Sequence, residues 1–73
     1  MRRANEITDD ELRGFAEWFY QRFRKKETRQ EWFETSLEGA FQVPVRDIKD
    51  IVKRMERLSL VSVKRTSIRI LNV

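Results

Sequence analysis

The stretch VPVRDIKDIVKRMERLSL, residues 43–60, decides what this chain of 73 residues can fold into. Pro44 can begin a helix, because its fixed φ suits the first turn and its missing N–H is a group that the turn leaves unpaired. After it, apolar residues return at three- and four-residue steps, which predicts one buried stripe on a helix over residues 44–58. The stripe consists of Val45, Ile48, Ile51, Val52, Met55 and Leu58.

The opposite side of this predicted helix is cationic. Arg46, Lys49, Lys53 and Arg57 return at the same steps, and Asp47, Asp50 and Glu56 interrupt their charge without cancelling it. Two interpretations are open for such a ridge: the solvated face of an ordinary surface helix, or a surface that lies along an anionic partner.

Length and composition exclude several classes of protein. Seventy-three residues make a single domain, residues 1–73, and the lack of cysteine and histidine removes disulfides and the usual zinc ligands, so we expect no cofactor. The sequence Asp9-Asp10-Glu11 is explained as the first turn of a helix, and no glycine-rich phosphate loop is present, so we expect no enzyme. No apolar run approaches the about 18 residues of a membrane span, which favours a cytoplasmic protein without membrane contact.

The positive charge belongs to the second half of the chain. Residues 1–38 hold eight cations and nine anions, whereas residues 39–73 hold eight cations and three anions. Such an asymmetry points toward nucleic acid or another anionic surface as partner.

Two helices are predicted before residue 43, after a short polar arm over residues 1–6. Thr8 and Glu11 have capping-box spacing, and Ile7 and Leu12 are placed for a hydrophobic staple, so the first helix should run over about 8–26 and end in the basic residues 22–26. The second should run over about 29–41, because Thr28 and Glu31 repeat that spacing. Its expected buried side is Phe33, Leu37, Ala40 and Phe41, with Ser36 and Gly39 where another helix can approach closely.

Two tryptophans lie at the edges of the apolar stripes of these helices. Trp18 and Trp32 either lean onto the surface of their own domain or mark a contact with a partner.

Beyond Leu60 the hydrophobic period changes from 3.6 to 2. Val61 and Val63, then Ile68 and Ile70, alternate with polar residues, which predicts a two-stranded β-hairpin over about 60–72. Its tip, residues 64–67, carries Lys64 and Arg65. The expected fold class is therefore α+β, with three helices and a C-terminal hairpin.

This order of elements resembles the winged helix-turn-helix domain of small bacterial and archaeal transcriptional regulators over residues 28–70. Residues 43–61 are similar to the recognition-helix segment of the Crp/Fnr type, in which a valine opens the turn. Lys53-Arg54-Met55-Glu56 matches its lysine-arginine-leucine-glutamate stretch, Ser59 its small residue, and Leu60-Val61 the pair that begins the wing.

The resemblance implies that helix 44–58 enters the major groove of double-stranded DNA and that the wing lies on the backbone. By position, Val45, Arg46, Lys49 and Asp50 fall where side chains contact bases, Lys53 and Arg57 nearer the phosphates, and Lys64 and Arg65 at the wing tip. Val45 and Asp50 replace the polar or basic residues of the Crp/Fnr type, so that type's sequence preference does not transfer.

Two functions stay open from the sequence. The first is binding of double-stranded DNA as a transcriptional regulator, with a homodimer as one possible form. The alternative is a protein-interaction subunit of a replication, transcription or membrane-remodelling complex, which would use the two tryptophans, because a fold does not by itself set a function. Single-stranded RNA is disfavoured, since the aromatic residues lie on core stripes rather than on an open sheet.

Overall fold

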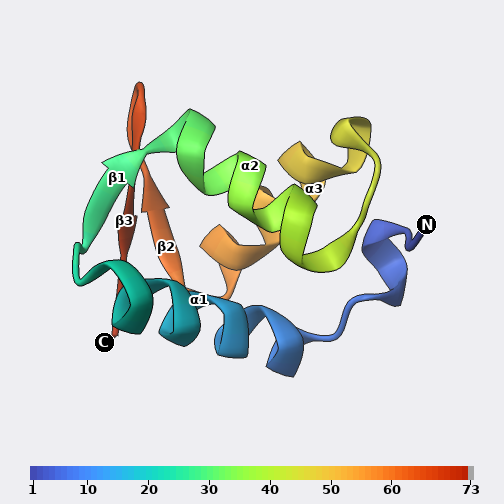
Figure 1. Cartoon of the computed structure of the whole chain (residues 1–73), viewed down its shortest axis with the longest axis horizontal. Helices are drawn as coiled ribbons and strands as arrows, with labels where there is room; N and C mark the ends of the chain where they lie inside the picture. Colours follow the sequence, from blue (N-terminus) through green and yellow to red (C-terminus); the bar gives the residue numbers. More distant parts are fainter. Residues whose placement is uncertain (73) are drawn as a thin grey trace.

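The three predicted helices are present in a computed structural model that describes residues 1–72: α1 (Asp9–Phe23), α2 (Gln30–Phe41) and α3 (Val45–Arg57). A short 3₁₀ helix, η1 (Ala4–Glu6), precedes them, and the strands are β1 (Glu27–Arg29), β2 (Val61–Val63) and β3 (Ser67–Ile70). In Figure 1, α1 and α2 run along the bottom and the top, α3 lies between and behind them, and the sheet stands at the left end. The α+β class is confirmed, and the arrangement is consistent with a helix-turn-helix followed by a β wing.

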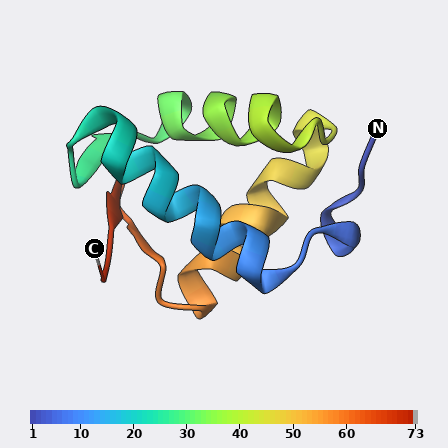
Figure 2. The same ribbon diagram turned by 60° about the horizontal axis from the view of Figure 1, so that its bottom comes forward.

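One hydrophobic core joins the three helices to strands β2 and β3. Figure 2 shows α1 crossing in front of α3, with α2 above both. The ring of Phe15 on α1 meets Phe33 on α2 edge-on, with 5.5 Å between centroids, which is a favoured aromatic geometry. The fully buried side chains are Ile7, Leu12, Phe19, Phe33, Leu37, Val43, Ile51, Met55, Val61, Ile68 and Ile70.

Helix α1 begins as predicted and ends earlier. The Thr8 side chain accepts from the Glu11 amide and the Glu11 carboxylate accepts from the Thr8 amide, so the capping box is formed. The helix stops at Phe23 rather than at Lys26, because Arg24 takes a left-handed conformation with φ of 57°. The carbonyl of Lys26 then accepts from the Ile70 amide at 2.6 Å, so this segment leaves the helix to meet the sheet.

Strand β1 was not predicted, and it makes the sheet three-stranded rather than two-stranded. The order is β1-β3-β2, both pairs antiparallel, with Thr28 opposite Ile68 and Val63 also opposite Ile68. The predicted Thr28 cap of the second helix is therefore wrong, since Thr28 is buried in β1 and no side chain caps α2. The Gln30 amide donates instead to the Thr66 carbonyl at 2.9 Å. Three residues are too few to show a period, and β1 exists because β3 offers it a free edge.

The start of α3 differs from its predicted stripe. Ile48, Ile51, Val52 and Met55 are buried as expected, but Val45 is 68% exposed. Val43, in the loop before Pro44, fills the buried position instead. Asp47, expected among the exposed charges, is buried, because its carboxylate accepts hydrogen bonds from the N-terminal residues Arg3 and Ala4.

The N-terminal residues are not a free polar arm. The Arg2 amide donates to the Gln42 carbonyl, and η1 packs beside α3. Ile7 is buried next to Leu12, so the predicted staple places both side chains in the core.

Candidate nucleic-acid interface

The outer side of α3 carries four positively charged side chains. Its residues Arg46, Lys49, Lys53 and Arg57 are all exposed, on the side of the helix away from the buried Ile48, Ile51, Val52 and Met55. Within residues 1–72, none of these four cations forms an ion pair. Asp50, which was also predicted to contact bases, is exposed beside them and is unpaired within residues 1–72. Four charges without carboxylate partners stay available to an external anion.

The wing tip carries this surface beyond the helix. The Lys64 amide donates to the Ser67 carbonyl at 2.8 Å and closes the turn, so Arg65 and Thr66 project into solvent. Arg65 and Lys49, 16 positions apart in the sequence, line one hollow of about 360 Å³ between α2, α3 and the tip. We call Arg46, Lys49, Lys53, Arg57 and Arg65 the cationic surface.

Lys64 has a different environment from Arg65. Its ammonium lies 3.4 Å from the Glu27 carboxylate on β1, and the Ser67 hydroxyl donates to the same carboxylate at 3.3 Å. Arg69 approaches Glu27 at 3.7 Å. Glu27 thus ties the unpredicted strand to the hairpin and partly neutralises one of the two predicted wing cations. An exposed pair of this kind is weak, so Lys64 keeps access to an anion.

An acidic flank of α2 borders the cationic surface, and sequence reasoning missed it. Glu31 and Glu34 line the same hollow as Lys49 and Arg65, and Glu34 and Glu38 line a second hollow of about 200 Å³ with Val45 and Lys49. The spacing of these glutamates, three and four residues, was the available signal. Their charge makes α2 a poor contributor of phosphate contacts.

The inner flank of α3, with Asp47 and Arg54, binds residues of the same chain through its charged side chains. The Asp47 carboxylate accepts from the Arg3 guanidinium and from the Ala4 amide, each at 3.0 Å. These hydrogen bonds, led by that of Arg3, hold the pKa of Asp47 below its ordinary value. Asp47 is therefore part of the contact with η1 and not of an external surface.

Arg54 also binds the N-terminal residues to α3. Its guanidinium donates to the carbonyls of Ala4 and Ile7 and forms an ion pair with Asp9 at 2.7 Å. Nearby, the Arg2 guanidinium pairs with Glu11 at 2.8 Å and, with the Thr8 amide, lowers the pKa of Glu11 to about 2. We call Arg3, Ala4, Asp47, Arg54 and Asp9 the N-terminal clamp.

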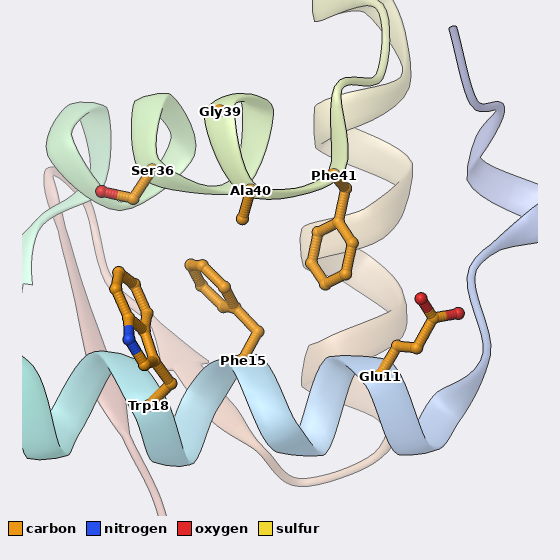
Figure 3. Close-up of a pocket in the computed structure, with 7 residues that line it drawn as sticks. All are labelled: Glu11, Phe15, Trp18, Ser36, Gly39, Ala40 and Phe41. Carbon is orange, nitrogen blue, oxygen red and sulfur yellow. The ribbon is translucent and has the colours of Figure 1, made fainter.

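The two tryptophans lie on a different side, along the seam of α1 and α2. Trp18 is 52% exposed and Trp32 40% exposed, and the ring of Phe23 lies between them, 6.3 Å and 4.5 Å from their centroids. Next to Trp18 runs an apolar groove of about 570 Å³, into which Phe15 and Ala40 also point (Figure 3). Both side chains are thus accessible to a partner, and both lean on their own domain.

No family model, no curated protein and no solved structure matches this chain. Over residues 1–72, none of the helices combines the length and the apolar character needed to cross a membrane.

Proposed function

We propose that this protein binds double-stranded DNA, with α3 in the major groove and the wing tip, residues 64–67, on the adjacent backbone. The observation that carries the proposal is the cationic surface: five exposed cations without ion pairs in residues 1–72, four along one side of α3 and the fifth at the wing tip. A solvated helix face alone does not account for Arg65, which comes from another element and meets Lys49 at one hollow.

The dimensions of the helix suit this task. The 13 residues of α3 extend about 20 Å, and a major groove about 12 Å wide admits a helix. Arg46 and Lys49, near its N-terminus, are suited to donate to guanine O6 and N7, and Asp50 to accept from cytosine N4. Lys53 and Arg57, further along, are placed for phosphates. Base contacts of this kind are what a transcriptional regulator needs, and that is the role we propose.

The acidic flank of α2 limits the footprint. Glu31 and Glu34 repel phosphates, so the backbone contacts come from α3 and the wing rather than from α2. About five contacts give a slope of log K against log salt near −4.5 through counter-ion release. Lys49 serves mainly base recognition, whereas Lys64 and Arg65 strengthen binding to every sequence alike.

The experiment is a fluorescence-anisotropy titration of duplexes selected from a random pool. A duplex of about 15 base pairs holds one copy and keeps the measurement independent of self-association. Between about 50 and 200 mM salt we expect affinity to fall by a factor of several hundred. Selection of a preferred sequence supports the regulatory role, and absence of binding to any duplex at the lowest salt overturns the proposal.

A charge reversal with a matched control localises the site. Lys53→Glu is expected to weaken binding at least about tenfold, because it replaces an attraction to phosphate by a repulsion. Lys25→Glu changes the net charge equally in the loop after α1, outside the cationic surface, and is expected to change affinity less than about threefold. Equal losses in the two variants would show nonspecific attraction to a basic protein.

A second candidate, a protein-interaction module, is favoured by the exposed groove beside Trp18. Recovery of a protein partner from a nuclease-treated lysate, together with no affinity for duplexes, would support it over DNA binding.

A further inference from the structure

We infer that Val45, at the start of α3, contacts the 5-methyl group of a thymine and so makes the protein prefer a T·A pair at one position of its DNA site. The inference rests on the proposed function, because it names one base that the DNA-binding surface recognises. Each base pair presents a different set of groups in the major groove, and the thymine methyl is the apolar group among them. An apolar side chain is therefore the contact that distinguishes thymine.

Val45 is exposed although its side chain is apolar. It is the first residue of α3 and is 68% exposed, whereas Val43, just before it, is buried in the core. Helix propensity does not explain a valine there, because its β-branched side chain makes it a poorer helix former than alanine, lysine or glutamate. A single exposed apolar residue is common on protein surfaces, so the surroundings of Val45 decide its use.

Two members of the cationic surface flank Val45. Arg46 follows it directly, and Lys49, one helical turn further on, lines the same hollow of about 200 Å³. Both cations are exposed, and neither forms an ion pair within residues 1–72. A ligand that suits this end of α3 is anionic and carries an apolar group beside hydrogen-bond acceptors. A thymine near a guanine has this combination, because guanine O6 and N7 accept from arginine or lysine.

The acidic flank of α2 directs Val45 toward bases rather than toward the backbone. Glu34 and Glu38 line the hollow beside Val45. Their negative charges repel phosphates but do not repel the uncharged edge of a base. Within this hollow, the group of DNA that meets Val45 is therefore a base edge.

The spacing of Val45 and Lys49 predicts where the thymine lies. One turn of an α-helix advances about 5.4 Å, and successive bases of a strand are about 3.4 Å apart along the DNA axis. When α3 lies along the groove, these two side chains reach bases one or two steps apart. We expect the selected sequence to contain a thymine within about two base pairs of a guanine.

The test replaces each thymine of the selected duplex in turn by deoxyuridine, which lacks the 5-methyl group and keeps the O4 acceptor and the pairing with adenine. In anisotropy titrations, one replacement should weaken binding of the unmodified protein about fourfold, the factor expected for burial of one methyl-sized group. Val45→Ala should lose this difference, with less than about 1.5-fold between the two duplexes. This variant is expected to fold, because the position is exposed and alanine is the better helix former.

Two further variants keep the test decisive. Lys53→Ala removes a proposed phosphate contact and should weaken the thymine and uracil duplexes alike, so the fourfold difference between them should stay. Val45→Thr retains one methyl group and should keep part of that difference. A separate pair of duplexes, with cytosine or 5-methylcytosine at the same position, isolates the methyl group from the rest of thymine. The unmodified protein should prefer the methylated base, and Val45→Ala should not.

The outcomes separate this inference from the proposed function. Absence of binding to any duplex at the lowest salt removes both. Binding of a preferred sequence in which no uracil replacement changes affinity overturns the contact with thymine alone. A uracil effect that Val45→Ala retains also overturns it, because another residue would then contact the methyl group. Loss of the effect in Val45→Ala, together with its retention in Lys53→Ala, supports the inference.

Discussion

Both flanks of α3 carry charged side chains, but those of one flank are bound within the molecule and those of the other face solvent. On the inner flank, Asp47 and Arg54 are bound to η1 and to the start of α1 through the N-terminal clamp. On the outer flank, Arg46, Lys53 and Arg57 have no ion pair within residues 1–72. The comparison teaches that the number of cations on a helix is a poor guide to function, because their availability depends on what lies opposite each one.

The largest expected effect comes from removing the outer flank as a whole. In the triple variant Arg46→Ala, Lys53→Ala and Arg57→Ala, affinity for the selected duplex should fall at least about 100-fold at moderate salt, and the salt slope should shrink from about −4.5 to about −2.7. The physical reason is the loss of the two phosphate contacts of Lys53 and Arg57, which changes the slope, together with the base contact of Arg46. Anisotropy titrations at several salt concentrations measure both quantities, and an unchanged slope would contradict the assignment of these residues.

The next largest effects are opposite changes in stability and DNA affinity when Arg54 or Arg57 is replaced by alanine. Arg54→Ala should destabilise the protein by about 2 kcal/mol in urea unfolding, because it removes the guanidinium donor from the partly buried carbonyl of Ile7 and leaves the carbonyl of Ala4 with the Ile7 amide alone. DNA affinity of the folded protein should stay the same. Arg57→Ala, one turn away, should do the reverse, with less than about 0.5 kcal/mol lost and weaker DNA binding. If both variants behaved alike, the contrast between the flanks would disappear.

A smaller effect on stability is expected when the pH is lowered. The pKa values of Asp47 and Glu11 are lowered in the folded state, so these carboxylates bind protons more readily when the chain unfolds. Their contribution to stability is complete above about pH 5 and is lost as the pH falls toward 2. Urea unfolding at a series of pH values should show this decline. Asp47→Asn should flatten the slope, since the amide cannot titrate, and a parallel slope in this variant would speak against the clamp.

The smallest expected change is a gain. Glu34→Gln removes one negative charge from the hollow that Lys49 and Arg65 share, and should raise DNA affinity about two- to threefold at low salt. Thr35→Gln, next to it and exposed, is the control without a charge change. The same titrations measure the gain, and a loss of affinity on Glu34→Gln would mean that this glutamate contacts the DNA.

Much of the fold was predictable because the apolar residues of its helices and strands recur at regular intervals along the sequence. The buried positions Ile48, Ile51 and Met55 and the alternation of Val61, Ile68 and Ile70 follow the 3.6- and 2-residue repeats. The capping box of Thr8 and Glu11 is likewise a local pattern. Strand β1 was missed for the converse reason, since three residues carry no period and the strand depends on an edge supplied 40 positions later.

The candidate site was predictable only in part. The outward direction of Lys53 and Arg57 follows from helix geometry once the buried stripe is known. The exposure of Val45 and the burial of Asp47 do not follow from helix geometry. Val43 is buried in place of Val45, and the η1 segment covers Asp47 and binds its carboxylate. The sequence also did not predict that Lys49, Arg65 and Glu34 line one hollow, because these residues belong to three different elements.

The sequence by itself determined three amphipathic helices, a basic hairpin and a cationic side on the third helix, because each is a repeat that neighbouring residues enforce. Only the tertiary structure decided which charges stay available. Whether a guanidinium meets a carboxylate, a carbonyl or water depends on chain segments up to 50 residues away in this protein, as the bond from Arg54 to Ala4 shows. Electrostatic partnership is a property of position in space, and the local pattern of residues does not contain it.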